Sequence, residues 1–327
     1  MKYEDILGQE NIAAHFKAAL KAGKISHAYL ICGEKGCGKK LLARTVAQSI
    51  QCTGEGDKPC GKCQACRQVE SGNHPDVRFV IKDDTKKAIS VDNIREQLVS
   101  DMTVKPYVGP KKIYIIDEAE KLNEQAQNAM LKTIEEPPEY GVVLILASSE
   151  TEMLQTIRSR CVILNMRPVA KDVIKRYLME NKGISEYMAE TAAGFSDGNI
   201  GKAVDYASSD RFSEELREVM TFAGNITRYN AGDIYSVMAA WAKDKAFIEE
   251  RLDLLYLYYR DMLVARSAGR GVQLNFKEYD REITRRAEDL SLKEINDCLE
   301  AIDKARTRLK YNVNTEATLV MLGMNLK

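Results

Sequence analysis

The sequence has no long hydrophobic run, no excess of charge of either sign, and no internal repeat or low-complexity tract. Because no apolar stretch reaches the roughly 18 residues of a membrane helix, we expect no membrane-spanning segment. The start of the chain is polar and acidic, so we expect no signal peptide and a cytoplasmic location. The 48 basic and 48 acidic side chains give a net charge of zero. A protein that wraps DNA by charge alone would be more basic, so any contact with nucleic acid is expected to be local or shared with partners.

The chain of 327 residues, 45% of them hydrophobic, is long for one domain, and we expect two or three. Five short apolar runs, separated by patterns of helical spacing, argue for a parallel sheet covered on both faces. The predicted strands span residues 28–32, 77–81, 113–116, 142–147 and 161–164. From residue 210 onward there is no strand pattern, and long helical stretches follow. The predicted fold class is therefore α/β followed by an all-α part.

A glycine-rich segment lies between the first predicted strand and the helix after it, as at the opening of a nucleotide-binding α/β domain. Residues 33–40 read G-E-K-G-C-G-K-K and fit the phosphate-loop pattern G-x-x-x-x-G-K. In such a loop, Gly33, Gly36 and Gly38 let backbone N–H groups converge on phosphate oxygens, and Lys39 reaches the terminal phosphates. The alternative is a fortuitous glycine-rich turn, which the flanking strand and helix disfavour.

Position 40 departs from the pattern of an active ATPase. A serine or threonine there would hold Mg²⁺ through its hydroxyl, whereas the ammonium of Lys40 has no lone pair for a metal and would repel one. The strand at 113–116 ends in Asp117 and Glu118, which in an active ATPase would assist Mg²⁺ and polarise the attacking water. Alternatively, the two acids cap the helix that follows. The sequence predicts a phosphate loop that has lost its metal, with a weakly competent loop as the alternative.

Four of the eight cysteines are clustered in a polar stretch. Cys52, Cys60, Cys63 and Cys66 have the spacing C-x7-C-x2-C-x2-C, and four thiolates at such a spacing can close a tetrahedral structural zinc site. Four unrelated reduced thiols are the first alternative, which is disfavoured because free cysteines prefer burial. A DNA-binding zinc finger is the second, which is disfavoured because the ligands frame no basic helix.

Further motifs accompany the phosphate loop and the cysteines: H-A-Y-L at 27–30, D-E-A-E at 117–120, N-A-M-L-K-T-I-E-E-P-P at 128–138, T-I-R-S-R-C at 156–161 and L-K-Y-N-V-N at 309–314. In combination, these motifs resemble those of the clamp-loader subunits of bacterial DNA polymerase III. The resemblance is dense over about residues 3–166 and returns near the C-terminus. It implies a AAA+ module with an inserted zinc module at about 52–66 in residues 1–166, a small helical lid at 167–208 and a helical collar at 209–327.

Two types of subunit share these features, the gamma/tau ATPase type and the delta-prime type. Lys40 favours the delta-prime type, and so does Gly201, which stands where the ATPase type has an arginine in the nucleotide-sensing motif at 198–203. The length also leaves room for a collar but not for the long tail of tau. The resemblance then implies that ATP and Mg²⁺ are not bound productively and that the isolated chain has no ATPase activity. An active gamma/tau-type ATPase and a zinc-dependent nucleic-acid-binding protein are the alternative functions.

The resemblance further implies a catalytic role in trans for Arg160, in the S-R-C motif at 159–161. Its guanidinium would neutralise charge on the nucleotide of a neighbouring subunit, and the alternative is a surface ion pair that pins the strand. Arg158 is a second candidate with a structural role. The implied partners are gamma/tau and delta subunits in a hetero-pentamer, the sliding clamp that it loads during DNA replication, and primer–template DNA. Arg95 and Lys105 are candidates for phosphate contacts, or parts of a solvated face.

Overall fold

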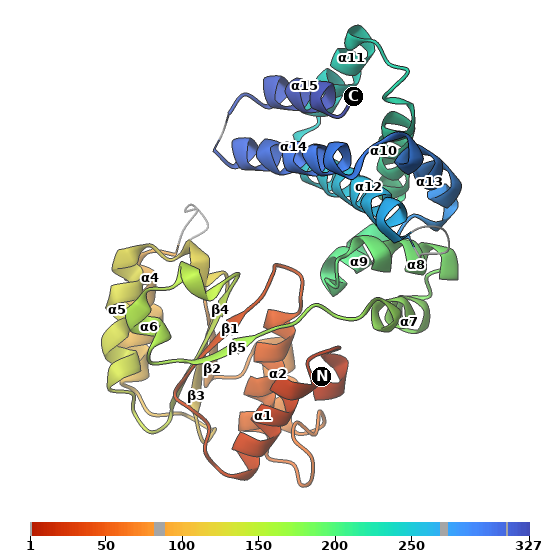
Figure 1. Cartoon of the computed structure of the whole chain (residues 1–327). Helices are drawn as coiled ribbons and strands as arrows, with labels where there is room; N and C mark the ends of the chain where they lie inside the picture. Colours follow the sequence, from red (N-terminus) through yellow and green to blue (C-terminus); the bar gives the residue numbers. More distant parts are fainter. Residues whose placement is uncertain (1, 82–88, 269–273, 312) are drawn as a thin grey trace. The chain divides into compact units, whose positions relative to one another are not determined.

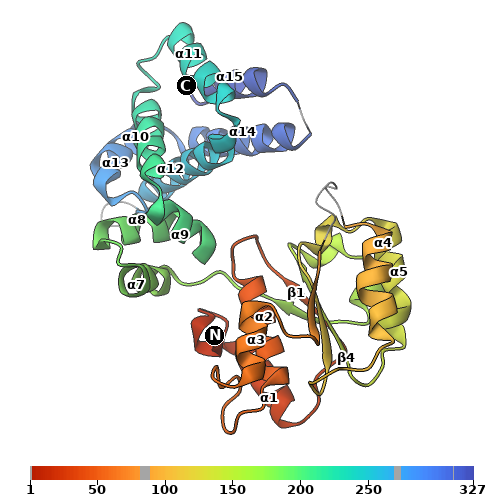
Figure 2. The same cartoon turned by 180° about the vertical axis from the view of Figure 1, so that it is seen from behind.

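The computed structural model describes residues 2–81, 89–268, 274–311 and 313–327 (Figures 1 and 2). The chain forms two compact units. The first unit consists of Met1–Ile174 and Gly198–Gly201, and the second of Lys175–Asp197 and Lys202–Lys327. The predicted division into three domains at 1–166, 167–208 and 209–327 stays a prediction.

The first unit is built on the five-stranded parallel sheet that the sequence predicts. Its strands are β1 (Ala28–Cys32), β2 (Val77–Val80), β3 (Lys112–Ile116), β4 (Gly141–Ala147) and β5 (Val162–Asn165). They lie in the order β2-β3-β4-β1-β5, and every pairing is parallel. The strands β1, β3 and β4 are buried along their whole length, which explains why, apart from the buried Lys112 at the start of β3, their sequences are apolar without alternation.

Helices cover both faces of this sheet, as Figures 1 and 2 show. On one face lie η1 (Tyr3–Asp5), α1 (Glu10–Lys21), α2 (Lys39–Gln51) and α3 (Gln64–Ser71); on the other lie α4 (Val91–Ile94), η2 (Arg95–Ser100), η3 (Ala119–Lys121), α5 (Glu124–Glu135), η4 (Glu150–Glu152) and α6 (Gln155–Arg158). Successive strand residues alternate between the two cores: Tyr29 packs on the α1–α2 side and Leu30 on the α5 side. This arrangement confirms the α/β fold class.

One predicted helix differs in its hydrogen bonding. The pattern at 91–102 predicts a single α-helix, but only its first turn is α4, and η2 continues it as a π-helix. Apolar spacing reports which face of a helix is buried, and it does not distinguish an i→i+5 bond from an i→i+4 bond over so short a segment.

In its described residues the second unit contains only helices, in agreement with the prediction for the region after residue 210. Two of these helices, α7 (Lys171–Lys182) and α9 (Ile200–Ser208), begin in residues of the first unit. The others are α8 (Glu186–Phe195), α10 (Asp210–Asn225), α11 (Ala231–Lys243), η5 (Lys245–Phe247), α12 (Ile248–Ala268), η6 (Lys277–Tyr279), α13 (Asp280–Asp289), α14 (Leu292–Lys310) and α15 (Thr315–Asn325). The long helix α12 packs against α10, α13 and α14, and α11 packs against α15. Trp241, Tyr258 and Tyr259 are among the largest side chains in this core.

Among the residues described, no helix combines the length and the apolar character that crossing a membrane requires.

Candidate functional site

The phosphate loop has the backbone shape that its sequence predicts. It joins the end of β1 to the start of α2, and Gly36 and Gly38 adopt φ angles of +91° and +100°, a left-handed region that glycine occupies without strain. The ammonium of Lys39 folds back into the loop. Its Nζ donates to the carbonyl oxygens of Gly33 at 2.5 Å and of Glu34 at 2.9 Å. The lysine that would bind phosphate is thus held over the loop by the loop's own backbone.

Lys40 lies in the first turn of α2 and faces the end of β3. Its Nζ is 3.2 Å from Oδ2 of Asp117, the residue directly after β3, and 5.5 Å from the centre of the Phe79 ring. The neighbouring carboxylate, Glu118, pairs in turn with Lys121 at 2.5 Å. Each of the two acids that would serve a metal therefore has a lysine as its counter-ion.

A distant segment of the chain closes over the phosphate loop. Asn199 is 3% exposed, and its side-chain amide donates to the carbonyl oxygen of Lys35 at 2.7 Å. The backbone N–H of Gly201 donates to the carbonyl oxygen of Gly36 at 3.0 Å. A Cβ atom at Gly201 would lie only 2.7 Å from the Cα of Gly36. Position 201 therefore has no room for an arginine in this arrangement. The sequence identified the missing arginine, but it did not single out Asn199.

Arg160 lies at the opposite end of the sheet from the phosphate loop. Because β1 and β5 are parallel and Tyr29 pairs with Val162, Arg160 stands at the amino ends of the strands, whereas the loop follows the carboxyl end of β1. The five-residue strand β1 separates these ends by about 16 Å. The guanidinium donates to the carbonyl oxygen of Thr156 at 2.9 Å and lies 3.0 Å from Oε1 of Glu135.

Arg160 is accessible and Arg158 is less so. The Arg160 side chain is 39% exposed, and both of its partners lie at the surface. Arg158 is half-buried, and its buried Nε finds no hydrogen-bond acceptor among the described residues. The two other basic candidates, Arg95 in η2 and Lys105 in the loop before β3, are exposed. Of these four candidates, Arg160 combines an ion-paired guanidinium with access from outside.

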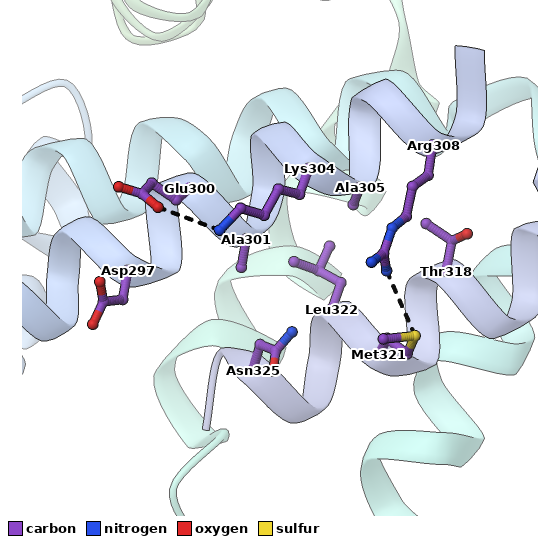
Figure 3. A pocket seen from close by; sticks show the side chains of 10 residues that line it. All are labelled: Asp297, Glu300, Ala301, Lys304, Ala305, Arg308, Thr318, Met321, Leu322 and Asn325. Carbon is purple, nitrogen blue, oxygen red and sulfur yellow. Dashed lines mark hydrogen bonds and ion pairs between the residues drawn. The ribbon is translucent and has the colours of Figure 1, made fainter. Parts of the chain in front are cut away.

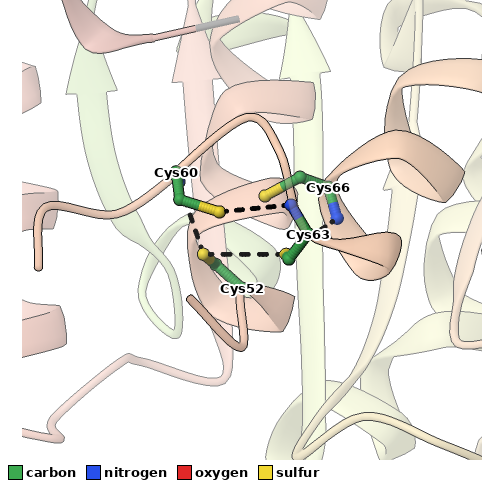
Figure 4. A group of neighbouring side chains, drawn as sticks. All are labelled: Cys52, Cys60, Cys63 and Cys66. Carbon is green, nitrogen blue, oxygen red and sulfur yellow. Dashed lines mark hydrogen bonds between the residues drawn. The ribbon is translucent and has the colours of Figure 1, made fainter. Parts of the chain in front are cut away.

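The four clustered cysteines lie together at the far end of α2 (Figure 4). We call residues 52–66 the cysteine knuckle. All four sulfur atoms are within 4.8 Å of one another, and those of Cys52 and Cys63 are 4.0 Å apart. A tetrahedral zinc site with Zn–S bonds of about 2.3 Å places its sulfurs about 3.8 Å apart. Cys52 follows the last residue of α2, and Cys63 is the N-cap of α3, so two helices orient two of the ligands.

The surroundings of the sulfurs also fit a bound cation. A Cβ atom at Gly54 would lie 2.6 Å from the sulfur of Cys60, so only glycine allows the turn to close around the group. Backbone N–H groups point at three of the sulfurs, each at 3.4 Å. Burial alone would raise the pKa of the Cys63 thiol, but N–H donors from Cys66 and Thr53 bring it to about 5. The residues present fit a structural zinc site with no open coordination position.

The second unit has a pocket of about 310 Å³ between α14 and α15 (Figure 3). Its charged side chains are of both signs, and several have partners within the pocket. Glu300 and Lys304 form an ion pair at 3.3 Å, and Arg308 lies 3.5 Å from the sulfur of Met321. With acidic and basic groups mixed along one wall, this pocket offers no single charge for a ligand to match.

The sequence matches two family models and several known proteins. The family model "DNA polymerase III, delta subunit" matches residues 8–170, and "DNA polymerase III, delta subunit, C terminal" matches residues 213–325. DNA polymerase III subunit delta' of Bacillus subtilis is 29% identical over 94% of this chain and 93% of its own length. DNA polymerase III subunit tau/gamma of Haemophilus influenzae is 36% identical over 54% of this chain and 25% of its own length. A DNA polymerase III gamma subunit-related protein of Thermotoga maritima aligns over 95% of this chain and 98% of its own, with a TM-score of 0.43 and 15% identity.

Proposed function

The chain belongs to the family of DNA polymerase III clamp-loader subunits, with a full-length likeness to the delta-prime type, and we propose that it acts there without hydrolysing ATP itself. In this proposal the chain is a fixed partner in a loader that opens the sliding clamp and places it on primed DNA. It supports ATP hydrolysis at a neighbouring subunit through Arg160. The similarity to a delta' subunit over 93% of that protein's length supports this assignment.

The contact between Lys40 and Asp117 is the observation that carries the proposal. In a working site a hydroxyl at position 40 and the carboxylate of Asp117 would both face Mg²⁺. Here an ammonium stands 3.2 Å from that carboxylate, so a positive charge of the protein takes the place of the metal's charge. A second cation at the same spot would be repelled by the first and would find no lone pair on it.

The closure of the phosphate loop is a second, independent support. Asn199 and Gly201 hold the carbonyl oxygens of two consecutive loop residues, and Lys39 holds two more. To reach a phosphate, Lys39 would have to leave its two carbonyl oxygens, while Asn199 and Gly201 keep the loop attached to the segment at 199–201. The loop is therefore better suited to joining segments of the chain than to releasing and rebinding a triphosphate.

The position of Arg160 supports a role in trans. Its distance from the chain's own loop, about 16 Å along the sheet, is too great for a contact with a nucleotide bound there. It is accessible, and the ion pair with Glu135 fixes the direction of its guanidinium. A planar, permanently charged group in a fixed position is suited to neutralising a transferring phosphoryl group.

The cysteine knuckle has a structural role in this proposal. A zinc ion held by Cys52, Cys60, Cys63 and Cys66 would replace a hydrophobic core in a stretch that has little apolar content. Since all four positions of the tetrahedron are filled by thiolates, the ion would be closed to substrates.

We further propose that the partners are gamma/tau and delta subunits in a hetero-pentamer, the sliding clamp, and primer–template DNA bound by the assembly. The net charge of zero supports a shared rather than an individual DNA-binding surface. Arg95 and Lys105 remain candidates for phosphate contacts within such an assembly.

Measuring ATP hydrolysis by the reconstituted loader tests this function. Loaders are assembled from gamma- and delta-type subunits with this chain as wild type, Arg160→Ala, Arg160→Lys or Arg167→Ala. We expect Arg160→Ala to slow clamp- and DNA-stimulated hydrolysis at least tenfold, with assembly intact, because the arginine finger is lost. Arg160→Lys rescues little, since an ammonium lacks the planar fork. The matched control Arg167→Ala, at another exposed arginine, leaves the rate unchanged. An unchanged rate with Arg160→Ala would reduce Arg160 to a surface ion pair.

A further inference from the structure

The first unit has a cleft of about 640 Å³ that the proposed function does not use. Its walls come from α1, the turn before β1, the end of α2, the cysteine knuckle and the loop before β3. We call it the lysine cleft, because Lys17, Lys21, Lys58 and Lys111 line it. A volume in the range of about 300–1,000 Å³ is typical of clefts that bury most of a drug-sized ligand.

The charge of the lysine cleft is strongly one-sided. Four lysines and a single acid, Asp57, line it, so the lining carries a formal charge of 4 − 1 = +3. Lys17 has an exposed ion pair with Glu4 at 2.9 Å, whereas Lys21 and Lys58 have no ion pair within the described residues. The cleft therefore differs from the pocket between α14 and α15, whose acidic and basic groups are mixed, and it favours an anionic ligand.

The floor of the cleft is aliphatic. Leu20, Ile25, Ile50 and Pro110 contribute to its lining, and there is no aromatic ring among the lining residues. Single-stranded nucleic acid is held mainly by bases stacked on aromatic rings and by a basic groove, and only the second of these is present. Aliphatic side chains flanked by acids match this lining better, because apolar burial and charge are satisfied together.

The walls of the cleft are held in place before any ligand arrives. The carboxylate of the buried Asp76 accepts three successive backbone N–H groups, from residues 107–109, at 2.6, 2.8 and 2.8 Å. The side chain of Gln51 donates to the carbonyl oxygen of Lys111 at 2.6 Å. On the other side, the knuckle from which Asp57 and Lys58 extend is held by backbone N–H groups of Cys60 and Cys63, which donate to the sulfurs of Cys52 and Cys60 at 3.4 Å. A preformed cleft loses little conformational entropy when it binds a ligand.

From these observations we propose that the lysine cleft binds an extended acidic peptide segment of a partner protein, with aliphatic side chains on its floor. The carboxylates of the segment pair with Lys21 and Lys58, and one or two leucine-like side chains contact Leu20, Ile25 and Ile50. This interaction goes beyond the proposed function, since it involves neither the phosphate loop nor Arg160. It also gives the cysteine knuckle a second task, because the knuckle forms one wall of the cleft.

Binding is measured by fluorescence anisotropy with the full-length chain and a short fluorescein-labelled peptide that is rich in aspartate and ends in two leucines. We expect saturable binding that weakens with added salt. The double charge reversal Lys21→Glu/Lys58→Glu weakens it about tenfold or more, because two exposed ion pairs become repulsive. The same peptide with serine in place of leucine also binds more weakly, since it leaves the floor uncovered.

A matched control and a nucleic-acid probe distinguish peptide binding in the cleft from unspecific charge attraction and from nucleic-acid binding. The variant Lys132→Glu/Lys182→Glu makes the same change of charge at exposed lysines that do not line the cleft, and it should bind the peptide as the wild type does. Oligothymidylate of matched charge should bind more weakly than the leucine peptide. The proposal is overturned if the leucine peptide fails to bind, if the control weakens binding as much as the double reversal in the cleft, or if oligothymidylate binds more tightly.

Discussion

The helix α2 has a sequence motif for ligand binding at each end, and the two motifs differ in how many of the expected donor atoms they contain. At its N-terminus is a phosphate loop that keeps its glycines and lysine but lacks the hydroxyl for a metal. At its C-terminus begins the cysteine knuckle, in which all four ligands are present and their sulfurs lie within 4.8 Å of one another. Both motifs fold into the expected backbone shape. The shape of a motif therefore does not establish its chemistry, which depends on each donor atom.

At the phosphate loop, side chains and backbone groups of the chain itself contact the loop and Asp117. Lys40 pairs with Asp117, and Asn199 and Gly201 bond to the carbonyls of the loop. The ammonium of Lys40 balances the charge of Asp117, as a metal ion would, and the bonds from Asn199 and Gly201 hold the loop against the segment at 199–201. In the cysteine knuckle the four sulfurs instead face one another, all within 4.8 Å (Figure 4).

Loss of the metal ligands at the complete end should have the largest effect. We expect the wild-type chain to carry about one zinc ion and Cys63→Ser to carry none, with a loss of several kcal/mol of stability because folding of the knuckle is coupled to the metal. Metal analysis and urea unfolding measure the two effects. Cys161→Ser, outside the cluster, should keep the zinc. A wild-type chain purified without any metal would contradict the account.

A side chain at the closure of the phosphate loop should have an intermediate effect. Gly201→Ala places a Cβ atom 2.7 Å from the Cα of Gly36, so the two segments must separate, at a cost of roughly 1–3 kcal/mol in the free energy of unfolding. Gly232→Ala is the matched control, since Gly232 is also the second residue of its helix and faces only a side-chain oxygen, at 3.1 Å. Urea denaturation that gives equal costs for both substitutions would argue against a tight closure.

Restoring the lost hydroxyl should have the smallest effect. In Lys40→Ser the half-exposed pair with Asp117 is lost, which changes stability by less than about 1 kcal/mol. We expect the variant to bind Mg-ATP no better than the wild type, because Asn199 and Gly201 still hold the loop. Calorimetric titration should detect improved binding only when Asn199→Ala is added. Strong Mg-ATP binding by Lys40→Ser alone would mean that the closure does not block the site.

The sequence predicts the sheet, the helix α2 and the proximity of the four cysteines well, because each depends on local patterns. The runs at β1, β3 and β4 are apolar without alternation, as strands buried on both faces must be. The spacing of the cysteines likewise requires only a short turn.

The closure of the phosphate loop was not predictable from such patterns. Asn199 is separated from Lys35 by 164 positions, and no local periodicity reports a contact of that kind. The resemblance points to Gly201 because the ATPase type has an arginine at that position. Only the structure shows why no side chain fits there: a Cβ atom at Gly201 would lie 2.7 Å from the Cα of Gly36. The lysine cleft also escaped prediction, because its four lysines come from three separate segments of the chain: α1, the cysteine knuckle and the loop before β3.

Nucleotide binding by the purified chain, with and without Mg²⁺, tests the central claim most directly. Because the proposal gives the ammonium of Lys40, 3.2 Å from Asp117, the place of a metal ion, the account predicts no ATP turnover and an affinity for ATP that Mg²⁺ does not increase. Steady turnover that Lys39→Ala abolishes, together with an affinity that Mg²⁺ strengthens, would contradict it and would identify the chain as an active ATPase.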